Sequence, residues 1–275
     1  MNKLRVVLVA PSAATMILLF FIPLLIVFAY SLLTRGPYGG VMPPWTGESY
    51  SRVFDPLYLE ILWRSVWIAF IATALCLVLG FPLALHIARS TKHKILLLNL
   101  VMLPFWTSFL IRTYAWMFLL RDTGLINSAL EAMHLIRQPL PLLFNTGAVI
   151  LGLLYGYLPF MVLPLYATLE KFDPALVDAA EDLGASPWTT LWRVIVPLTK
   201  PGMVAGCLLV FIPCVGAYLT PDLMGGGKTV MVGNLVQNQF TTSRDWPFGS
   251  AVSLLLMGLV VLVMRIIGRR GEELI

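Results

Sequence analysis

The chain has 275 residues, of which 59% are hydrophobic and only 12% are charged, about half of the roughly 25% that is typical of soluble domains. This composition excludes an ordinary soluble domain and indicates a membrane protein. The formal net charge of +5 does not indicate nucleic-acid binding, because the basic residues are scattered between apolar segments and form no basic helix or aromatic-interleaved patch.

Six apolar segments are long enough to cross a bilayer, which takes about 20 residues. We predict transmembrane helices at about 6–33, 65–88, 95–119, 147–169, 202–221 and 249–268. The start of the first segment imitates a signal peptide, but its apolar run extends to Leu33, far beyond an h-region of about 7–15 residues. We therefore expect an uncleaved first span and a single transmembrane domain over residues 1–275.

The distribution of basic residues predicts the orientation of these helices. An even number of spans puts both termini on one side, and the connections on that side carry more Lys and Arg than the opposite ones. By the positive-inside rule the termini are cytoplasmic. The three outer connections are long and rich in Gly, Pro and Trp, and one holds a helical pattern from Gly124 to Leu135.

The predicted transmembrane helices contain pairs of glycines and several prolines. Gly152–Gly156 and Gly202–Gly206 are small-xxx-small pairs, which we interpret as helix packing within the chain in preference to a dimer seam. Prolines fall within or at the ends of several spans, where neighbouring helices can satisfy the freed carbonyl groups. Kinked helices around a pathway are expected.

The longest inner connection, 173–197, predicts two short helices joined by a glycine. Asp173 can cap a helix that starts at Pro174, and Gly184 supplies a left-handed stop. Ser186 and Pro187 then repeat the start signal for a second helix, which we expect to end near residue 197. The segment is interpreted as helix, glycine elbow and helix across the cytoplasmic face.

The same segment carries a spaced motif: Asp178-Ala179-Ala180, three residues, Gly184, nine residues, then Val194-Ile195-Val196-Pro197. It resembles the EAA loop of ABC importer permeases, in which Glu-Ala-Ala, Gly and Ile-x-Leu-Pro are expected at this spacing. Asp178 replaces Glu and Val196 replaces Leu, and the shorter Asp178 side chain leaves its partner open.

This resemblance implies an all-α integral membrane fold of six helices, the type I ABC importer permease (MetI-like) fold with cytoplasmic coupling helices. In that family the helix pair docks in a cleft of the ATP-hydrolysing subunit. The residues to which the resemblance gives a coupling role are Asp178, Ala179, Ala180, Gly184 and Pro197.

Four further blocks resemble the permeases of spermidine/putrescine importers, although related importers of other small amines share parts of them. The blocks are Leu103-Pro-Phe-Trp-Thr-Ser-Phe-Leu-Ile-Arg112-Thr-Tyr-Ala-Trp116, Leu158-Pro-Phe-Met-Val-Leu-Pro-Leu-Tyr166, Asp222-Leu-Met-Gly-Gly226 and Arg244-Asp-Trp-Pro-Phe-Gly249. The resemblance implies import of a polyamine or a related small cationic amine across the bacterial inner membrane.

The partners that this resemblance implies are two ATP-hydrolysing subunits, a second homologous permease and a periplasmic substrate-binding protein. The two permeases are expected to differ, so that the pathway is formed by a heterodimer. ATP and Mg²⁺ would be bound by the ATPase subunits, while this chain binds no cofactor and catalyses no reaction. Besides protein partners, the chain meets membrane lipid.

A polycation that leaves water needs carboxylates or aromatic faces. Asp222 is predicted to end the fifth helix at the outer side with Tyr218 one turn before it, and a carboxylate at a helix C-terminus gains from a nearby cation. The third helix contributes Trp106, Tyr114 and Trp116, for which an interfacial aromatic belt is the alternative interpretation.

Our hypothesis is that Asp222, Tyr218 and these aromatic residues line the outer part of the substrate pathway, and two more features belong to it. Arg112 is the ionisable residue that lies clearly within a span, and we expect it to face protein or an aqueous path, in either a structural or a gating role. Asp245 and Trp246 precede the sixth helix.

Other classes of site find little support. Gly225-Gly-Gly-Lys228-Thr229 resembles the end of a phosphate-binding loop, but Asp222 stands where that loop requires its first glycine. The three histidines and the three cysteines show no metal-ligand spacing, so no metal site is predicted; these residues are His86, His93, His134, Cys76, Cys207 and Cys214.

Three alternatives stay open: an ABC importer permease for a different small solute, a secondary transporter or channel for a small organic cation, and a static scaffold, which the proline-broken helices disfavour. A secondary transporter would be expected to carry inverted repeats and several ionisable residues near the midplane.

Overall fold

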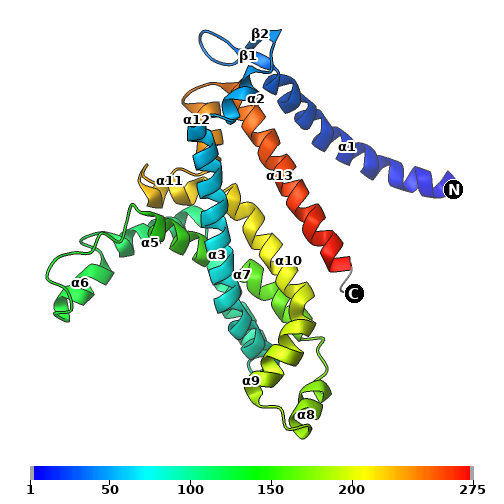
Figure 1. The fold of residues 1–275 in the computed structure, drawn as a ribbon, viewed down its shortest axis with the longest axis vertical. Coiled ribbons are helices and arrows are strands. Elements are labelled where there is room, and N and C mark those ends of the chain that lie inside the picture. Colours follow the sequence, from blue (N-terminus) through cyan, green and yellow to red (C-terminus); the bar gives the residue numbers. More distant parts are fainter. Residues whose placement is uncertain (1–2, 273–275) are drawn as a thin grey trace. The chain divides into compact units, whose positions relative to one another are not determined.

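A computed structural model describes residues 3–272, with the side chains of residues 9–265. Helices dominate this part of the chain, and a single two-stranded sheet is present in it (Figure 1). The predicted all-α class is confirmed. The chain divides into two compact units, one formed by residues up to Ile61 with Leu235–Leu262, the other by Leu62–Asn234 with the chain from Val263 on.

The first unit begins with α1 (Lys3–Ser31). The chain then forms a hairpin of β1 (Leu33–Arg35) and β2 (Val41–Trp45), which pair antiparallel with Thr34 opposite Met42. A short helix, α2 (Glu48–Val53), follows. The larger parts of α12 (Val232–Thr241) and α13 (Trp246–Glu272) complete the unit.

The second unit is organised around α7 (Thr146–Leu169) and α10 (Val196–Val215), which pack closely against each other. Most of α3 (Pro56–Arg89) belongs to the same unit, and its Cys76 thiol lies 3.7 Å from the Leu154 carbonyl oxygen of α7. A Cβ atom added to Gly202 would lie 2.8 Å from the carbonyl oxygen of Pro164, and one added to Gly206 would lie 2.7 Å from Sδ of Met161. The glycines therefore permit close approach of two helices within the chain, as predicted.

The span predicted at about 95–119 is present, but it is broken into separate helices. The structure has α4 (Lys94–Met102), a 3-10 turn η1 (Leu103–Trp106) and α5 (Phe109–Leu120). The chain bends by 90° at the break before Phe109. At this break the Thr107 hydroxyl donates a hydrogen bond to the Pro104 carbonyl oxygen at 2.8 Å. The side chain thus competes for an acceptor that a continuing helix would use.

The outer connection after α5 contains α6 (Leu125–Ala132), within the predicted helical pattern at 124–135. Asn127, in the first turn of α6, is fully buried. Its side chain donates to the carbonyl oxygens of Arg121 and Leu140 and accepts from the Leu140 N–H. One side chain thereby fixes the loop on both sides of α6.

The predicted fifth helix, 202–221, is wrong at both ends. Helical structure runs without interruption from α9 (Pro187–Thr190) through a π-helical turn η2 (Leu191–Ile195) into α10, which ends at Val215. Pro197 does not end this helix, since the π-helical turn before it is a local adjustment of the kind that accommodates a proline within a span. At the other end Gly216 caps the helix, and α11 (Leu219–Gly225) is a separate element.

Within residues 3–272, five helices are long and apolar enough to cross a membrane, and the bent pair formed by Lys94–Trp106 and Phe109–Ala132 brings the number to six. The remaining short helix, α8 (Ala175–Asp182), precedes α9. In the second unit α8 and α9 lie at one end of α10 and α11 lies at the other (Figure 1).

Candidate functional site

The glycine elbow of the inner connection is built by local backbone hydrogen bonds. The Asp173 carboxylate accepts from the Ala175 N–H at 3.0 Å and so starts α8. At its end Gly184 has φ of +80°, and the Ala185 N–H reaches back to the Ala180 carbonyl oxygen at 3.0 Å. This is the left-handed stop that the sequence predicted.

The second half of the elbow is continuous with a long helix. The Ser186 hydroxyl accepts from the Thr189 N–H at 3.3 Å, as a helix cap does. The π-helical turn follows, in which the Val196 N–H bonds to the Leu191 carbonyl oxygen. The predicted end near Pro197 is wrong, because that residue lies exposed in the first turn of α10.

Several side chains of the elbow are exposed and contact little else in the described part of the chain. Asp178 and Ala179 are exposed and Ala180 is half-buried. Leu183, one residue before the glycine, is 89% exposed. Trp188 and Trp192 are also exposed and pack edge to face, with ring centroids 5.7 Å apart. An apolar surface with a neighbouring carboxylate is typical of a protein contact.

Behind α8 there is a cavity of about 470 Å³. It lies between α8 and the ends of α3 and α7; among the residues that line it are Arg89, Glu170, Phe172, Val177, Asp178 and Ile195. The Lys94 ammonium donates to Glu170, and this hydrogen bond lowers the pKa of the Glu170 carboxyl below its ordinary value. On this side α8 borders the cavity and is not closely packed against α3 or α7.

The structure corrects the expected placement of Asp222. It does not end the fifth helix; it lies exposed in the first turn of the separate helix α11, with Tyr218 at the N-cap. In a first turn the helix dipole favours a carboxylate, the opposite of the C-terminal setting that was predicted. Among the described residues the Asp222 carboxylate has no ion-pair partner.

The predicted aromatic residues of the third helix lie on both sides of its break. Trp106 ends η1 and is 78% exposed. Tyr114 is exposed on α5, whereas Trp116 is half-buried and packs edge to face on Tyr155 at 5.5 Å. The structure brings α5 and α11 next to each other.

Arg112 faces protein, as predicted. Its guanidinium carbon lies 4.6 Å from the centroid of the Phe105 ring and 5.5 Å from that of Phe109. Its Nε and Nη1 atoms are buried without a hydrogen-bond partner among the described residues. Cation–π contacts contribute roughly 0.5–2 kcal/mol, whereas an unsatisfied buried donor costs about 1–3 kcal/mol or more when charged. The guanidinium is therefore held weakly.

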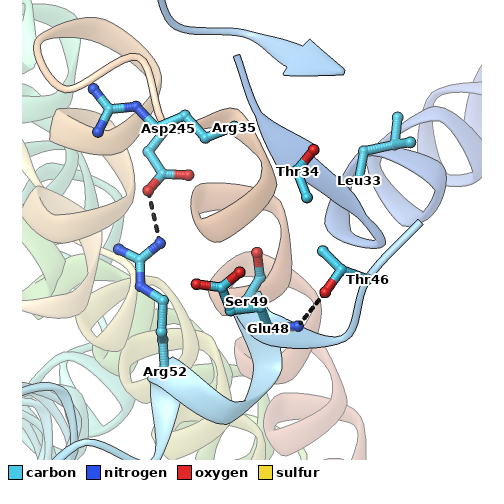
Figure 2. A pocket seen from close by; sticks show the side chains of 8 residues that line it. All are labelled: Leu33, Thr34, Arg35, Thr46, Glu48, Ser49, Arg52 and Asp245. Carbon is cyan, nitrogen blue, oxygen red and sulfur yellow. Dashed lines mark hydrogen bonds and ion pairs between the residues drawn. The ribbon is translucent and has the colours of Figure 1, made fainter. Parts of the chain in front are cut away.

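In the first unit, a polar pocket of about 320 Å³ lies beside the β1–β2 hairpin and α2 (Figure 2). Asp245 is only 2% exposed, and its Oδ2 atom accepts from Arg52 Nη1 at 2.9 Å. Its other oxygen accepts from the Phe248 N–H at the start of α13. Burial alone lowers the pKa of Arg52, but hydrogen bonds to Asp245 and Tyr58 raise it above the ordinary value. Arg52 therefore stays charged and anchors α2 to the start of α13.

Sequence reasoning missed two sets of residues. Arg52 and Asp245 are 193 positions apart, and nothing local connects them. Phe105 and Phe109 lie in the segment from Leu103 to Trp116. The spacing of three residues between Phe109 and Arg112 on one helix was an available signal for their contact.

The chain is similar to known transport proteins over most of its length. The family model described as "Binding-protein-dependent transport system inner membrane component" matches residues 77–271. The spermidine/putrescine transport system permease protein PotB of Haemophilus influenzae is 43% identical over 274 residues, covering 99% of this chain and 96% of the relative. PotB of Escherichia coli K12 is 46% identical over 253 residues, covering 90% and 92%.

Solved structures agree on the fold. A bacterial ABC transporter involved in the import of the acidic polysaccharide alginate contains a chain with a TM-score of 0.76 at 14% identity, covering 98% of this chain and 95% of that one. A chain of the MetNI methionine ABC transporter in an inward-facing conformation has a TM-score of 0.57 at 19% identity, covering 79% and 95%.

Proposed function

Because the chain belongs to the family of binding-protein-dependent transport system inner membrane components, we propose that it is the permease subunit of an ABC importer for spermidine, putrescine or a related small polyamine. The observation that carries the proposal is the 43–46% identity to PotB permeases over at least 90% of the chain. The chain is a multi-pass inner-membrane protein, and it acts as a single permease domain.

The elbow is the part of the chain that contacts the ATP-hydrolysing subunits. Two ATP-hydrolysing subunits bind ATP and Mg²⁺, and one of them receives α8 and α9, with Asp178, Ala179, Ala180 and Gly184 at the contact. The exposed apolar surface at Leu183 and Trp188 and the cavity behind α8 support this role, since a docking helix needs both an uncovered face and room to move. The permease itself binds no cofactor and makes or breaks no covalent bond.

The orientation follows from the positive-inside rule, with both termini in the cytoplasm. The elbow is then cytoplasmic, while α11 with Tyr218 and Asp222, and the polar pocket beside α2, lie on the periplasmic side. A periplasmic binding protein delivers the amine there. Asp222, an exposed carboxylate with no ion-pair partner in the described part of the chain, is placed to receive an ammonium group.

The second half of the pathway is a homologous but different permease, so the membrane domain is a heterodimer. The exposed aromatic residues Trp106 and Tyr114, on either side of the break in the third span, support a pathway-lining role for this region. Irregular backbone at membrane depth is tolerated where it is buried in protein or lines an aqueous cavity.

Reconstitution tests the proposal. The chain is co-expressed with its candidate partner permease and ATPase, purified and placed in liposomes, and uptake of radiolabelled spermidine and putrescine is measured with the binding protein outside. Uptake is expected to require ATP on the elbow side, the binding protein and all subunits. Uptake by the chain alone under an ion gradient, without ATP, would contradict the proposal and favour a secondary transporter.

A further inference from the structure

Four aromatic rings form a connected row around the break in the third span. The Phe105 ring meets Phe160 edge to face with centroids 5.1 Å apart, Phe160 lies 6.2 Å from Tyr157, and Tyr157 lies 6.4 Å from Phe109. The rings come from η1, α5 and α7. We call this row, Phe105, Phe109, Tyr157 and Phe160, the aromatic box.

A cation already occupies the aromatic box. The guanidinium of Arg112 lies over Phe105 and Phe109, the two ends of the row, and so closes it. Guanidinium and ammonium groups both bind to the negative faces of aromatic rings. The side chains therefore form a site for a positively charged organic group, with an occupant supplied by the chain itself.

The occupant is poorly held, because Nε and Nη1 of Arg112 are buried with no acceptor among the residues that the structure describes. A buried guanidinium normally forms several charge-assisted hydrogen bonds. Only the ring faces stabilise these two atoms in the described part, so another cation can compete for the same faces. Phe160 is exposed and leaves a side of the box open to such a competitor.

The position of the box fits a transport site. It adjoins the break at Thr107 and Ser108, where the span bends by 90°. Discontinuous helices form the substrate sites of many transporters, because their irregular backbone lines a cavity. A primary ammonium is smaller than a guanidinium, so it can enter a space that the Arg112 side chain leaves.

We propose that the aromatic box binds an ammonium group of the transported amine, and that Arg112 is a tethered cation which fills the box until the amine displaces it. This inference rests on the proposed function, from which it takes the class of substrate. While Arg112 fills the box, its charge also repels free cations, as fixed positive charge does in other pores. Arg112 thereby closes the path to cations that do not compete for the rings.

Direct binding tests the box without the binding protein. The assembled permease–ATPase complex is placed in nanodiscs, and the Kd of tritiated spermidine is measured without nucleotide. Arg112→Gln removes the tethered charge and is expected to tighten binding by about threefold to tenfold, while Arg112→Lys, which keeps a tethered cation, stays near the original value. In the Arg112→Gln background, Phe105→Leu and Phe160→Leu are expected to reverse the gain.

Phe118→Leu is the matched control, since Phe118 is an exposed ring on the same helix and is not part of the box; it should leave the Kd unchanged. An unchanged Kd with Arg112→Gln overturns the inference. The inference is also overturned if the second permease is lost when the Arg112→Gln complex is purified. That result would mean that in the unmodified complex the guanidinium binds an acceptor on the second permease. If the unmodified complex takes up no polyamine in the liposome assay, the proposed function fails instead.

Discussion

The backbone conformation of Gly184 gives a sharp test of the elbow. Its φ of +80° lies in the left-handed region, and no heavy atom lies within 4 Å of the position where a Cβ would stand. Gly184→Val therefore adds conformational strain without a steric clash. The left-handed region costs an L-residue about 1–2 kcal/mol, which corresponds to a roughly 5- to 30-fold fall in the population of the elbow conformation.

Gly227→Val is the matched control. Gly227 has φ of +75°, also with nothing within 4 Å of its added Cβ, and it follows α11 at the other end of α10. The two substitutions carry the same strain, but only Gly184→Val distorts the proposed motor contact. A third variant, Gly184→Asn, should be tolerated better than Val, because Asn adopts the left-handed region more readily.

The assay is ATP hydrolysis by the reconstituted complex, with and without the substrate-loaded binding protein. With Gly184→Val, stimulation by the loaded binding protein is expected to fall at least several-fold, while the amount of chain in the membrane stays normal. Gly227→Val should keep its stimulation. Full stimulation with Gly184→Val, or equal loss in both variants, would refute the role of the elbow.

Three further substitutions test other parts of the molecule. Asp222→Asn keeps the shape and removes the charge, so uptake at limiting polyamine should fall several-fold with assembly and basal ATP hydrolysis near normal; unchanged uptake rejects the pathway role, and lost assembly indicates a structural one. Gly202→Val forces a Cβ against the Thr168 hydroxyl and is expected to cost about 1–3 kcal/mol, seen as a lower unfolding temperature in detergent; an unchanged temperature would contradict the close packing of α7 on α10. Asp245→Asn leaves the Arg52 charge without its carboxylate, and because Arg52 is partly exposed we expect a loss of only about 1–2 kcal/mol, which Arg52→Met in the same chain should partly restore.

Local signals predicted the elbow well, because each of its parts is decided within a few residues. The Asp173 carboxylate and the Ser186 hydroxyl each accept a hydrogen bond from a backbone N–H at the start of a helix, and Gly184 adopts the left-handed conformation between them. The resemblance of the motif to the EAA loop rests on the same residues.

The rest of the candidate site depended on signals that hydropathy does not carry. The break before Phe109 comes from a hydroxyl that bonds to the Pro104 carbonyl, within a segment whose apolar character is continuous. Asp222 was misplaced because Gly216 ends α10 early and a separate short helix follows. The Arg52–Asp245 pair joins residues 193 apart, and pairs of this kind come from tertiary packing alone.

The unbroken helix from Pro187 to Val215 has a mechanical consequence. At a rise of about 1.5 Å per residue its 29 residues form a rod of roughly 43 Å, with the second half of the elbow at one end and α11 just beyond the other. The π-helical turn lies inside this rod, and Gly184 lies just before the end that we propose to contact the ATPase subunit. The rod can therefore act as a lever arm: a tilt of about 10° at the elbow would displace its far end by roughly 7 Å.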